Sequence, residues 1–73
     1  MTATLTERAE SCTATKKQLQ VFEDAIRVYL RSDATITGSM DEDGTMIITV
    51  EEDGATSWAR FKRNGLIEGD WVW

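Results

Sequence analysis

Apolar side chains recur every three or four positions between residues 15 and 32, which is the spacing that puts them on one face of an α-helix. Thr15 and Gln18 have the spacing of a capping box, in which each side chain binds the backbone N–H of the other residue. Arg27 stands near the end of the segment, where positive charge complements the helix dipole. The pattern predicts an amphipathic helix over residues 15–32. Its apolar stripe consists of Leu19, Phe22, Ala25, Ile26, Tyr29 and Leu30.

Residues 1–14 carry a weaker pattern. Thr4 and Glu7 also have capping-box spacing and would begin a short helix that carries Leu5 and Cys12. The threonines at positions 13 and 15 disfavour a helix that continues through this region, because a β-branched side chain loses rotamer freedom there. We expect residues 1–14 to be frayed or to form a short extra helix.

After Asp33 the chain changes to β-branched residues separated by glycine-containing turns, a pattern typical of strands. The connections are so short that only antiparallel neighbours are possible. The sequence predicts a single α+β domain over residues 1–73, with one amphipathic helix packed on one face of a four-stranded antiparallel β-meander over residues 34–73, in the order α-β-β-β-β. The four predicted strands are residues 34–40, 45–50, 55–63 and 66–73.

The faces of these strands depend on the turn in "EEDGATSW", residues 51–58. A two-residue turn at Asp53-Gly54 and a three-residue turn at 52–54 put Trp58 on opposite faces, because side chains alternate along a strand. Asn64-Gly65 has the composition of a two-residue type I′ turn. Such a turn would set Trp58 opposite Trp71.

Two carboxylates downstream favour the three-residue turn at 52–54. With a two-residue turn, Glu68 and Asp70 would face the core, and burying an unpaired carboxylate costs several kcal/mol. With Gly54 in the left-handed conformation of a three-residue turn, the acids face water and Trp58 packs beneath the helix. A similar turn at 42–44 completes the predicted core face, which consists of Ile36, Met40, Met46, Ile48, Val50, Trp58, Trp71 and Trp73.

The opposite face of the predicted sheet is left without a helix. It combines hydroxyl side chains with an apolar streak, and a clustered streak of this kind on a small domain is typical of a dimer or partner site. We expect a small non-enzymatic protein-binding module that acts through this face, as a homodimer or docked on a protein partner. The candidate protein-interaction residues are Ile47, Thr49, Ala59, Phe61, Arg63 and Val72.

The composition limits the available chemistry. The chain has 73 residues, no histidine and one cysteine, Cys12, so an internal disulfide is impossible and a metal held by nitrogen or sulfur is not expected. "DEDGT" is similar to part of a calcium loop, but Val50 stands where such a loop needs a glutamate. There is no P-loop and no recognisable nucleophile–base pair, so we expect neither catalysis nor a cofactor.

The net charge of −5 is concentrated over residues 33–56, which hold seven acids and no base. A chain without a broad basic surface is not expected to bind duplex DNA. The alternative function is a nucleic-acid-directed protein, either an acidic mimic of DNA or a single-strand binder that uses Trp58, Arg60 and Lys62 of "WARFKR". No segment has the apolar length of a membrane helix or the pattern of a signal peptide, so we expect a cytoplasmic location and no membrane partner.

Overall fold

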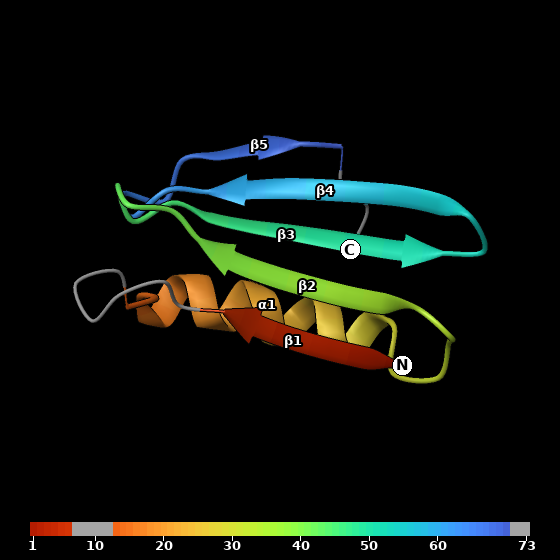
Figure 1. Ribbon diagram of the computed structural model, residues 1–73. Coiled ribbons are helices and arrows are strands. Elements are labelled where there is room, and N and C mark those ends of the chain that lie inside the picture. Colours follow the sequence, from red (N-terminus) through yellow and green to blue (C-terminus); the bar gives the residue numbers. More distant parts are fainter. Residues whose placement is uncertain (7–12, 71–73) are drawn as a thin grey trace.

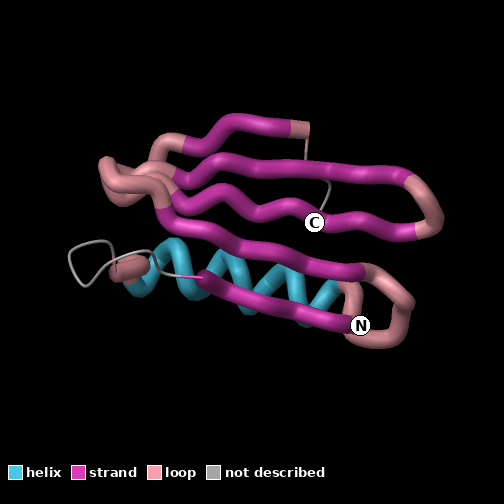
Figure 2. The backbone as a smooth tube through the Cα atoms, viewed as in Figure 1, coloured by secondary structure: helices cyan, strands magenta, loops and turns pink. Residues whose placement is uncertain are grey.

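The computed structural model describes residues 1–6 and 13–70, which form one helix and a five-stranded mixed sheet (Figure 1). The strands lie in the sheet in their order along the chain, with β1 and β2 parallel and all other neighbours antiparallel. The helix lies on one face of the sheet, beside β1 and β2 (Figure 2). The elements are β1 (Thr2–Thr6), α1 (Lys16–Val28), β2 (Thr35–Met40), β3 (Met46–Glu52), β4 (Ala55–Phe61) and β5 (Ile67–Gly69).

Strand β1 corrects the prediction for the N-terminal residues and the prediction of a wholly antiparallel four-stranded sheet. Residues 2–6 form neither a frayed end nor a helix but pair in parallel with β2, from Thr2 opposite Thr35 onward. The alternation of threonine with Ala3 and Leu5 suits a strand, because its threonines face water while Leu5 packs against the core. A parallel neighbour requires a crossover connection, and α1 lies within it.

Helix α1 confirms the predicted capping box. The Thr15 side chain accepts from the Gln18 backbone N–H, and the Gln18 side chain accepts from the Thr15 backbone N–H. The helix ends at Val28 with Tyr29 as its C-cap, before the predicted end at residue 32. Its buried residues are Gln18, Phe22 and Ala25, whereas Leu19 and Leu30 of the predicted stripe are exposed. The helix face that packs on the sheet is therefore not centred on the predicted apolar stripe. It is turned about the helix axis so that Gln18 is buried and Leu19 is exposed.

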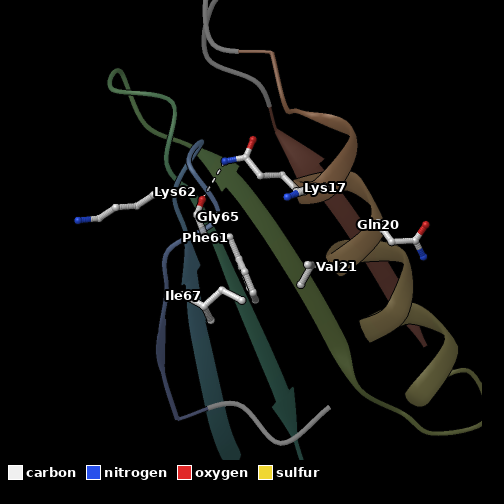
Figure 3. A pocket seen from close by; sticks show the side chains of 8 residues that line it. Lys17, Gln20, Val21, Phe61, Lys62, Gly65 and Ile67 are labelled. Atoms are coloured by element: carbon white, nitrogen blue, oxygen red, sulfur yellow. Dashed lines mark hydrogen bonds between the residues drawn. The ribbon is translucent and has the colours of Figure 1, made fainter.

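Gln18 is a polar residue buried between the helix and the sheet. Its side chain is only 2% exposed, yet both hydrogens of its amide are used. Nε2 donates to the carbonyl oxygens of Gly44 and Phe61, each at 2.8 Å, and the bond to Phe61 is drawn in Figure 3. A buried amide with all its donors satisfied is stable in a core. Gln18 thus joins the start of α1 to the turn after β2 and to the end of β4.

Gly38 sets how closely the helix approaches the sheet. A Cβ atom on Gly38 would lie 2.8 Å from the Phe22 ring and 2.9 Å from Leu5 Cδ1. The Phe22 ring therefore rests against the backbone of β2, and any side chain larger than hydrogen at position 38 would push it away.

The rest of the core is formed mainly by the helix-facing residues of β2, β3 and β4: Ile36, Met40, Met46, Ile48, Val50, Ala59 and Phe61.

The turn at 42–44 has three residues, as predicted. The backbone of Asp41 bonds to Thr45 and Gly44, and Gly44 has a φ of 85°. Met40 is consequently opposite Met46, and the predicted alignment of Ile36 and Met40 with the core face of β3 is confirmed.

The turn at 63–65 also has three residues, which corrects the predicted two-residue turn at Asn64-Gly65. Lys62 bonds to Leu66 and Gly65 through the backbone, and only Gly65 of this turn has positive φ. The Asn64 side chain accepts from the Leu66 N–H at 3.1 Å, just as Asp43 accepts from Thr45 at 3.0 Å in the earlier turn.

The turn at Asp53-Gly54 has two residues, and the predicted three-residue turn is wrong. Glu52 pairs directly with Ala55, and Asp53 and Gly54 both have positive φ, at 52° and 81°, as a type I′ turn requires. Positive φ at Gly54 was itself predicted and is confirmed. In this register Ala59 and Phe61 face the helix, while Trp58 and Arg60 face away from it.

The two corrections to the turns compensate each other. The extra residue in the turn at 63–65 moves Glu68 opposite Arg60, on the face away from the helix. The observed pair of turns therefore buries Ala59 and Phe61 and leaves the charges of Arg60 and Glu68 in water. The predicted Trp58–Trp71 pair involves a residue outside the described range, and the described neighbour of Trp58 is Asp70.

Candidate functional site

The candidate site is the face of the sheet that α1 does not cover, called the open face below. It is rich in hydroxyl groups, because threonine or serine occupies most positions on its β1 and β2 strands. Thr2 lies opposite Thr35 and Thr4 opposite Thr37 in this array. By the alternation of the paired strands, the open face consists of Thr2, Thr4, Thr6, Thr35, Thr37, Ser39, Ile47, Thr49, Glu51, Thr56, Trp58, Arg60 and Glu68.

Trp58 is the one large aromatic side chain among the described residues of the open face. It lies opposite Thr49 and is 38% exposed. The Asp70 side chain accepts a hydrogen bond from the backbone N–H of Trp58 at 2.8 Å. The carbonyl oxygen of Trp58 accepts one from the Asp70 N–H at 3.1 Å. Both bonds join the Trp58 backbone to Asp70 on the β5 side of the strand, so the indole projects from a fixed position.

Arg60 lies beside Trp58 on the same strand and completes a mixed aromatic and charged cluster. Its Cζ atom is 5.6 Å from the centroid of the indole, within the range of a cation–π contact. Nη1 of Arg60 lies 2.8 Å from Oε1 of Glu68 on β5. Both side chains are about half exposed, so the ion pair adds little to stability but fixes the guanidinium next to the ring.

The structure divides the predicted interaction residues between the two faces of the sheet. Ile47 and Thr49 lie on the open face and are half-buried. Ala59 and Phe61 lie on the helix side, and Phe61 is only 3% exposed, so neither is accessible to a partner. They fell on the wrong face because the turn at 53–54 is one residue shorter than predicted. Val72 lies outside the described residues.

Arg63 has a structural position in the turn after β4. Its side chain lies directly over Gly44, where a Cβ atom would collide with it. Its Nη1 donates to the carbonyl oxygen of Thr13 at 3.2 Å. Arg63 therefore ties the turn at 63–65 to the turn at 42–44 and to the segment before the helix, away from the open face.

The sequence pattern predicts Trp58 in the core and makes Trp58 and Arg60 surface residues only in the nucleic-acid alternative. The Asp-Gly pair at 53–54 fits the two-residue turn that puts them on the surface. The same pair at 43–44 lies in a three-residue turn, so this composition alone does not decide the face. The third member of that alternative, Lys62, lies at the rim of a hollow on the helix side, and its ammonium group points away from the hollow (Figure 3).

The hollow lies between α1 and the β4–β5 edge and has a volume of about 340 Å³. Phe61, Val21 and Ile67 form its apolar wall, and Lys17 lies at its helix side (Figure 3). The described lining holds no carboxylate, thiol or hydroxyl group. The full described lining is Lys17, Gln18, Gln20, Val21, Phe61, Lys62, Gly65 and Ile67.

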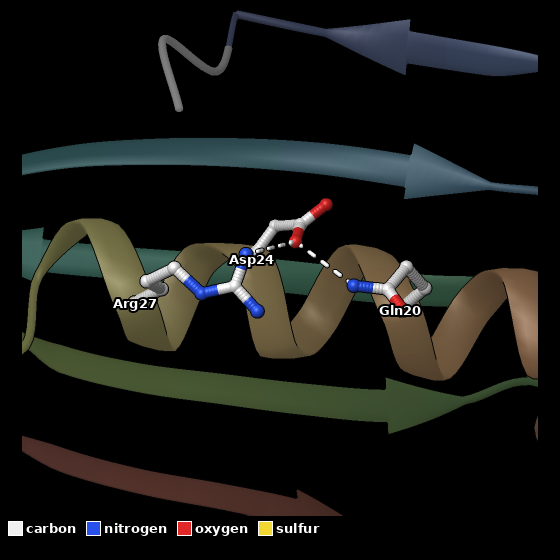
Figure 4. A network of polar contacts seen from close by, with 3 residues as sticks. All are labelled: Gln20, Asp24 and Arg27. Carbon is white, nitrogen blue, oxygen red and sulfur yellow. Dashed lines mark hydrogen bonds and ion pairs between the residues drawn. The ribbon is translucent and has the colours of Figure 1, made fainter.

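The outer surface of α1 carries a short polar network (Figure 4). Gln20 Nε2 donates to Asp24 Oδ1 at 3.0 Å, and Arg27 Nη1 lies 3.5 Å from the same oxygen. All three groups are in contact with solvent, and pairs of this kind stabilise a helix by a few tenths of a kcal/mol at most. This network supports the helix and has no feature of a binding site.

The acidic turns do not assemble a metal site: within the described part of the chain, no group of three acidic or cysteine side chains is arranged to hold a metal ion. Asp43 accepts a hydrogen bond from the Thr45 backbone N–H, and this bond lowers the pKa of the Asp43 carboxyl below its ordinary value.

Within residues 1–6 and 13–70, no helix is long and apolar enough to cross a membrane.

Comparison of the chain with protein-family models, with curated proteins and with solved structures gave no match in any of the three.

Proposed function

We propose that this protein is a small binding module whose open face docks on a protein partner, with Trp58 as the central contact. The observation that carries the proposal is a tryptophan 38% exposed in the middle of a sheet face, with an arginine fixed beside it. Tryptophan and arginine are the residues most enriched among those that dominate binding energy at protein interfaces. Half-buried Ile47 and Thr49 on β3 supply the adjoining apolar and hydroxyl surface.

The charge of the chain indicates what kind of partner this face fits. Glu51 and Glu68 lie on the open face and Asp70 adjoins Trp58, while Arg60 is already paired with Glu68. The whole chain carries a net charge of −5. Two such faces would repel each other, whereas a basic surface would be attracted and oriented. The partner we propose is a protein with a basic patch around an apolar pocket that receives the indole.

A single-stranded nucleic acid is the second candidate, because Trp58 and Arg60 are both on the open face. Binding of this class needs several stacking aromatics along a positively charged groove. Trp58 is the only aromatic on the described open face, Phe61 is buried, and Glu68 neutralises Arg60. These features favour a protein partner over a nucleic acid.

The test compares Trp58→Ala with Val28→Ala, which removes an exposed apolar side chain from the outer surface of α1. Proteins retained from the native source by both immobilised wild type and Val28→Ala are the candidate partners. With one of these purified, we expect Trp58→Ala to raise the Kd at least tenfold, about 1.4 kcal/mol. We expect Val28→Ala to change the Kd less than twofold.

Two results would reject the proposal. One is a partner whose Kd is the same for Trp58→Ala and for wild type. The other is micromolar binding of an oligothymidine, measured by fluorescence anisotropy, that is lost steeply with added salt and with Trp58→Ala, because this result would establish the nucleic-acid alternative. Both variants are checked for native far-UV circular dichroism first.

A further inference from the structure

The outer edge of β1 has backbone groups that no described element binds. Thr2 donates its N–H to Ala34 on the β2 side, at 3.0 Å. Because backbone groups point to alternate sides along a strand, Thr2, Thr4 and Thr6 bond toward β2, and Ala3 and Leu5 direct their N–H and C=O groups outward. The strand therefore offers two donors and two acceptors at the rim of the sheet.

This edge lacks the features that normally prevent strands from associating. Charged side chains, proline, a bulge or a short edge strand serve that purpose in most sheets. The opposite edge has two of them, since β5 has only three residues and carries Glu68. Strand β1 has five residues with no charge and no proline, although charged residues make up 29% of the chain.

The sequence of β1 is complementary to itself when two copies run antiparallel. With Thr4 opposite Thr4 of a second copy, Ala3 of each strand lies opposite Leu5 of the other. Two opposite residues whose backbone groups both point across the junction form two hydrogen bonds with each other. The register contains two such pairs, each of Ala3 with Leu5, and therefore four hydrogen bonds. Threonine meets threonine on the open face, and Ala3 meets Leu5 on the helix side.

The helix adds an apolar flank on the same side of the molecule. Val21 faces the hollow beside β4 and β5. Residues on a helix are about 100° apart, so Leu19 is about 200° from Val21 and lies on the opposite flank, toward β1. Leu19 is 37% exposed, and Ile26, seven residues later on the same flank, is half-buried. Together with Leu5 on β1, they put apolar side chains on both the helix and the strand at this edge.

We propose that two copies of the chain associate through the β1 edge, forming a continuous ten-stranded sheet with both helices on one side. The contact region is roughly 17 Å long for a five-residue strand and spans the strand and one helix flank. A strip of this size is smaller than a standard interface, which buries about 800 Å² on each partner. The dimer is accordingly expected to be weak and reversible.

Disulfide trapping tests this register directly. Thr4→Cys is made with Cys12→Ser, so that one thiol remains. Opposite residues of a non-hydrogen-bonded pair have Cα atoms about 4.5 Å apart, which a disulfide can bridge. We expect Thr4→Cys to form a covalent dimer under mild oxidation at 100 µM protein. Thr37→Cys, on the open face of β2, is the matched control and stays monomeric. Equal trapping at both positions, or none at Thr4→Cys, would reject the proposed contact.

Sedimentation equilibrium from 10 µM to 1 mM provides a second measurement without a thiol. Ala3→Pro removes an outward N–H and no bond to β2, and Leu19→Lys adds charge to the apolar flank. Each is expected to weaken the dimer at least tenfold, while Val28→Lys on the outer surface leaves it unchanged. A wild-type monomer at 1 mM would overturn the inference. Trp58→Ala leaves this dimer intact, so failure of the proposed function would be recognised separately.

Discussion

Gln18 donates from Nε2 to the carbonyl oxygen of Phe61, a residue more than half the chain away, and the same nitrogen donates to Gly44. One amide thereby holds the start of α1 against the ends of two hairpins. Replacing Gln18 with alanine would leave both carbonyl oxygens without this donor and would remove half of the capping box. We expect a loss of about 2–4 kcal/mol of unfolding free energy, measured by urea denaturation.

The control for this prediction is Gln20→Ala, which changes the same residue type on the exposed side of the same helix. Its side chain donates to Asp24 in a solvent-exposed pair. We expect a change within about 0.5 kcal/mol. Equal effects of Gln18→Ala and Gln20→Ala would mean that the buried bonds contribute nothing net.

The register of β4 predicts opposite results for two aromatic residues three positions apart. Phe61→Ala removes a buried ring that packs beneath the helix and should cost about 3–5 kcal/mol. Trp58→Ala removes an exposed ring and should cost about 1 kcal/mol or less. Thermal and urea unfolding of the two variants measure the difference, and the reverse order would indicate a three-residue turn at 52–54.

Gly44 and Gly54 have nearly the same φ, at 85° and 81°, but different surroundings. Nothing lies near a Cβ atom on Gly54, so Gly54→Ala should cost only the backbone strain, about 1 kcal/mol. A Cβ atom on Gly44 would collide with the Arg63 side chain, so Gly44→Ala should cost more. In a double-mutant cycle, Arg63→Ala should reduce that excess, and strict additivity of the two changes would contradict this account.

The hydrogen bond of Asp43 in the turn at 42–44 should make the folding stability of the chain depend on pH in the acid range. The pKa of Asp43 is lowered in the folded chain because its carboxylate accepts the Thr45 N–H. Protonation therefore favours the unfolded state, and the stabilisation by Asp43 is complete above its ordinary pKa of 3.8 and is lost as the pH falls through the lower folded value. An NMR titration should give a pKa below that value. In Asp43→Asn, stability should depend less on pH below 4 than in wild type.

The sequence predicted correctly those elements that depend on residues close together in the chain. Thr15 and Gln18 set the start of the helix, and the burial of Ile36, Met40 and Ile48 follows from the alternation of β2 and β3 and the turn between them. The first strand was missed because Thr4 and Glu7 have helix-cap spacing, while the parallel pairing that stabilises β1 is a tertiary contact.

The position of the candidate site could not be predicted because it depends on two turn lengths. "EDGT" at 42–45 and "EDGA" at 52–55 share three residues yet form turns of three and two residues. Each residue gained or lost in a turn exchanges the faces of the next strand. What decides the register is the burial of all of β4: one choice puts Ala59 and Phe61 in the core, and the other puts Trp58, Arg60 and Lys62 there.

The parallel position of β1 makes its attachment different in kind from that of the other strands. Turns of two or three residues join β2 through β5, so each of those pairings closes a small loop, whereas β1 meets β2 only after the chain has passed through α1. Closing the longer loop costs more entropy, so β1 is the strand expected to dock last and to detach first. Native-state hydrogen exchange should then show the Thr2, Thr4 and Thr6 amides exchanging before those of β3. Such an opening would briefly turn β2 into the edge of the sheet, with a neutral row of unpaired backbone groups between Thr35 and Met40.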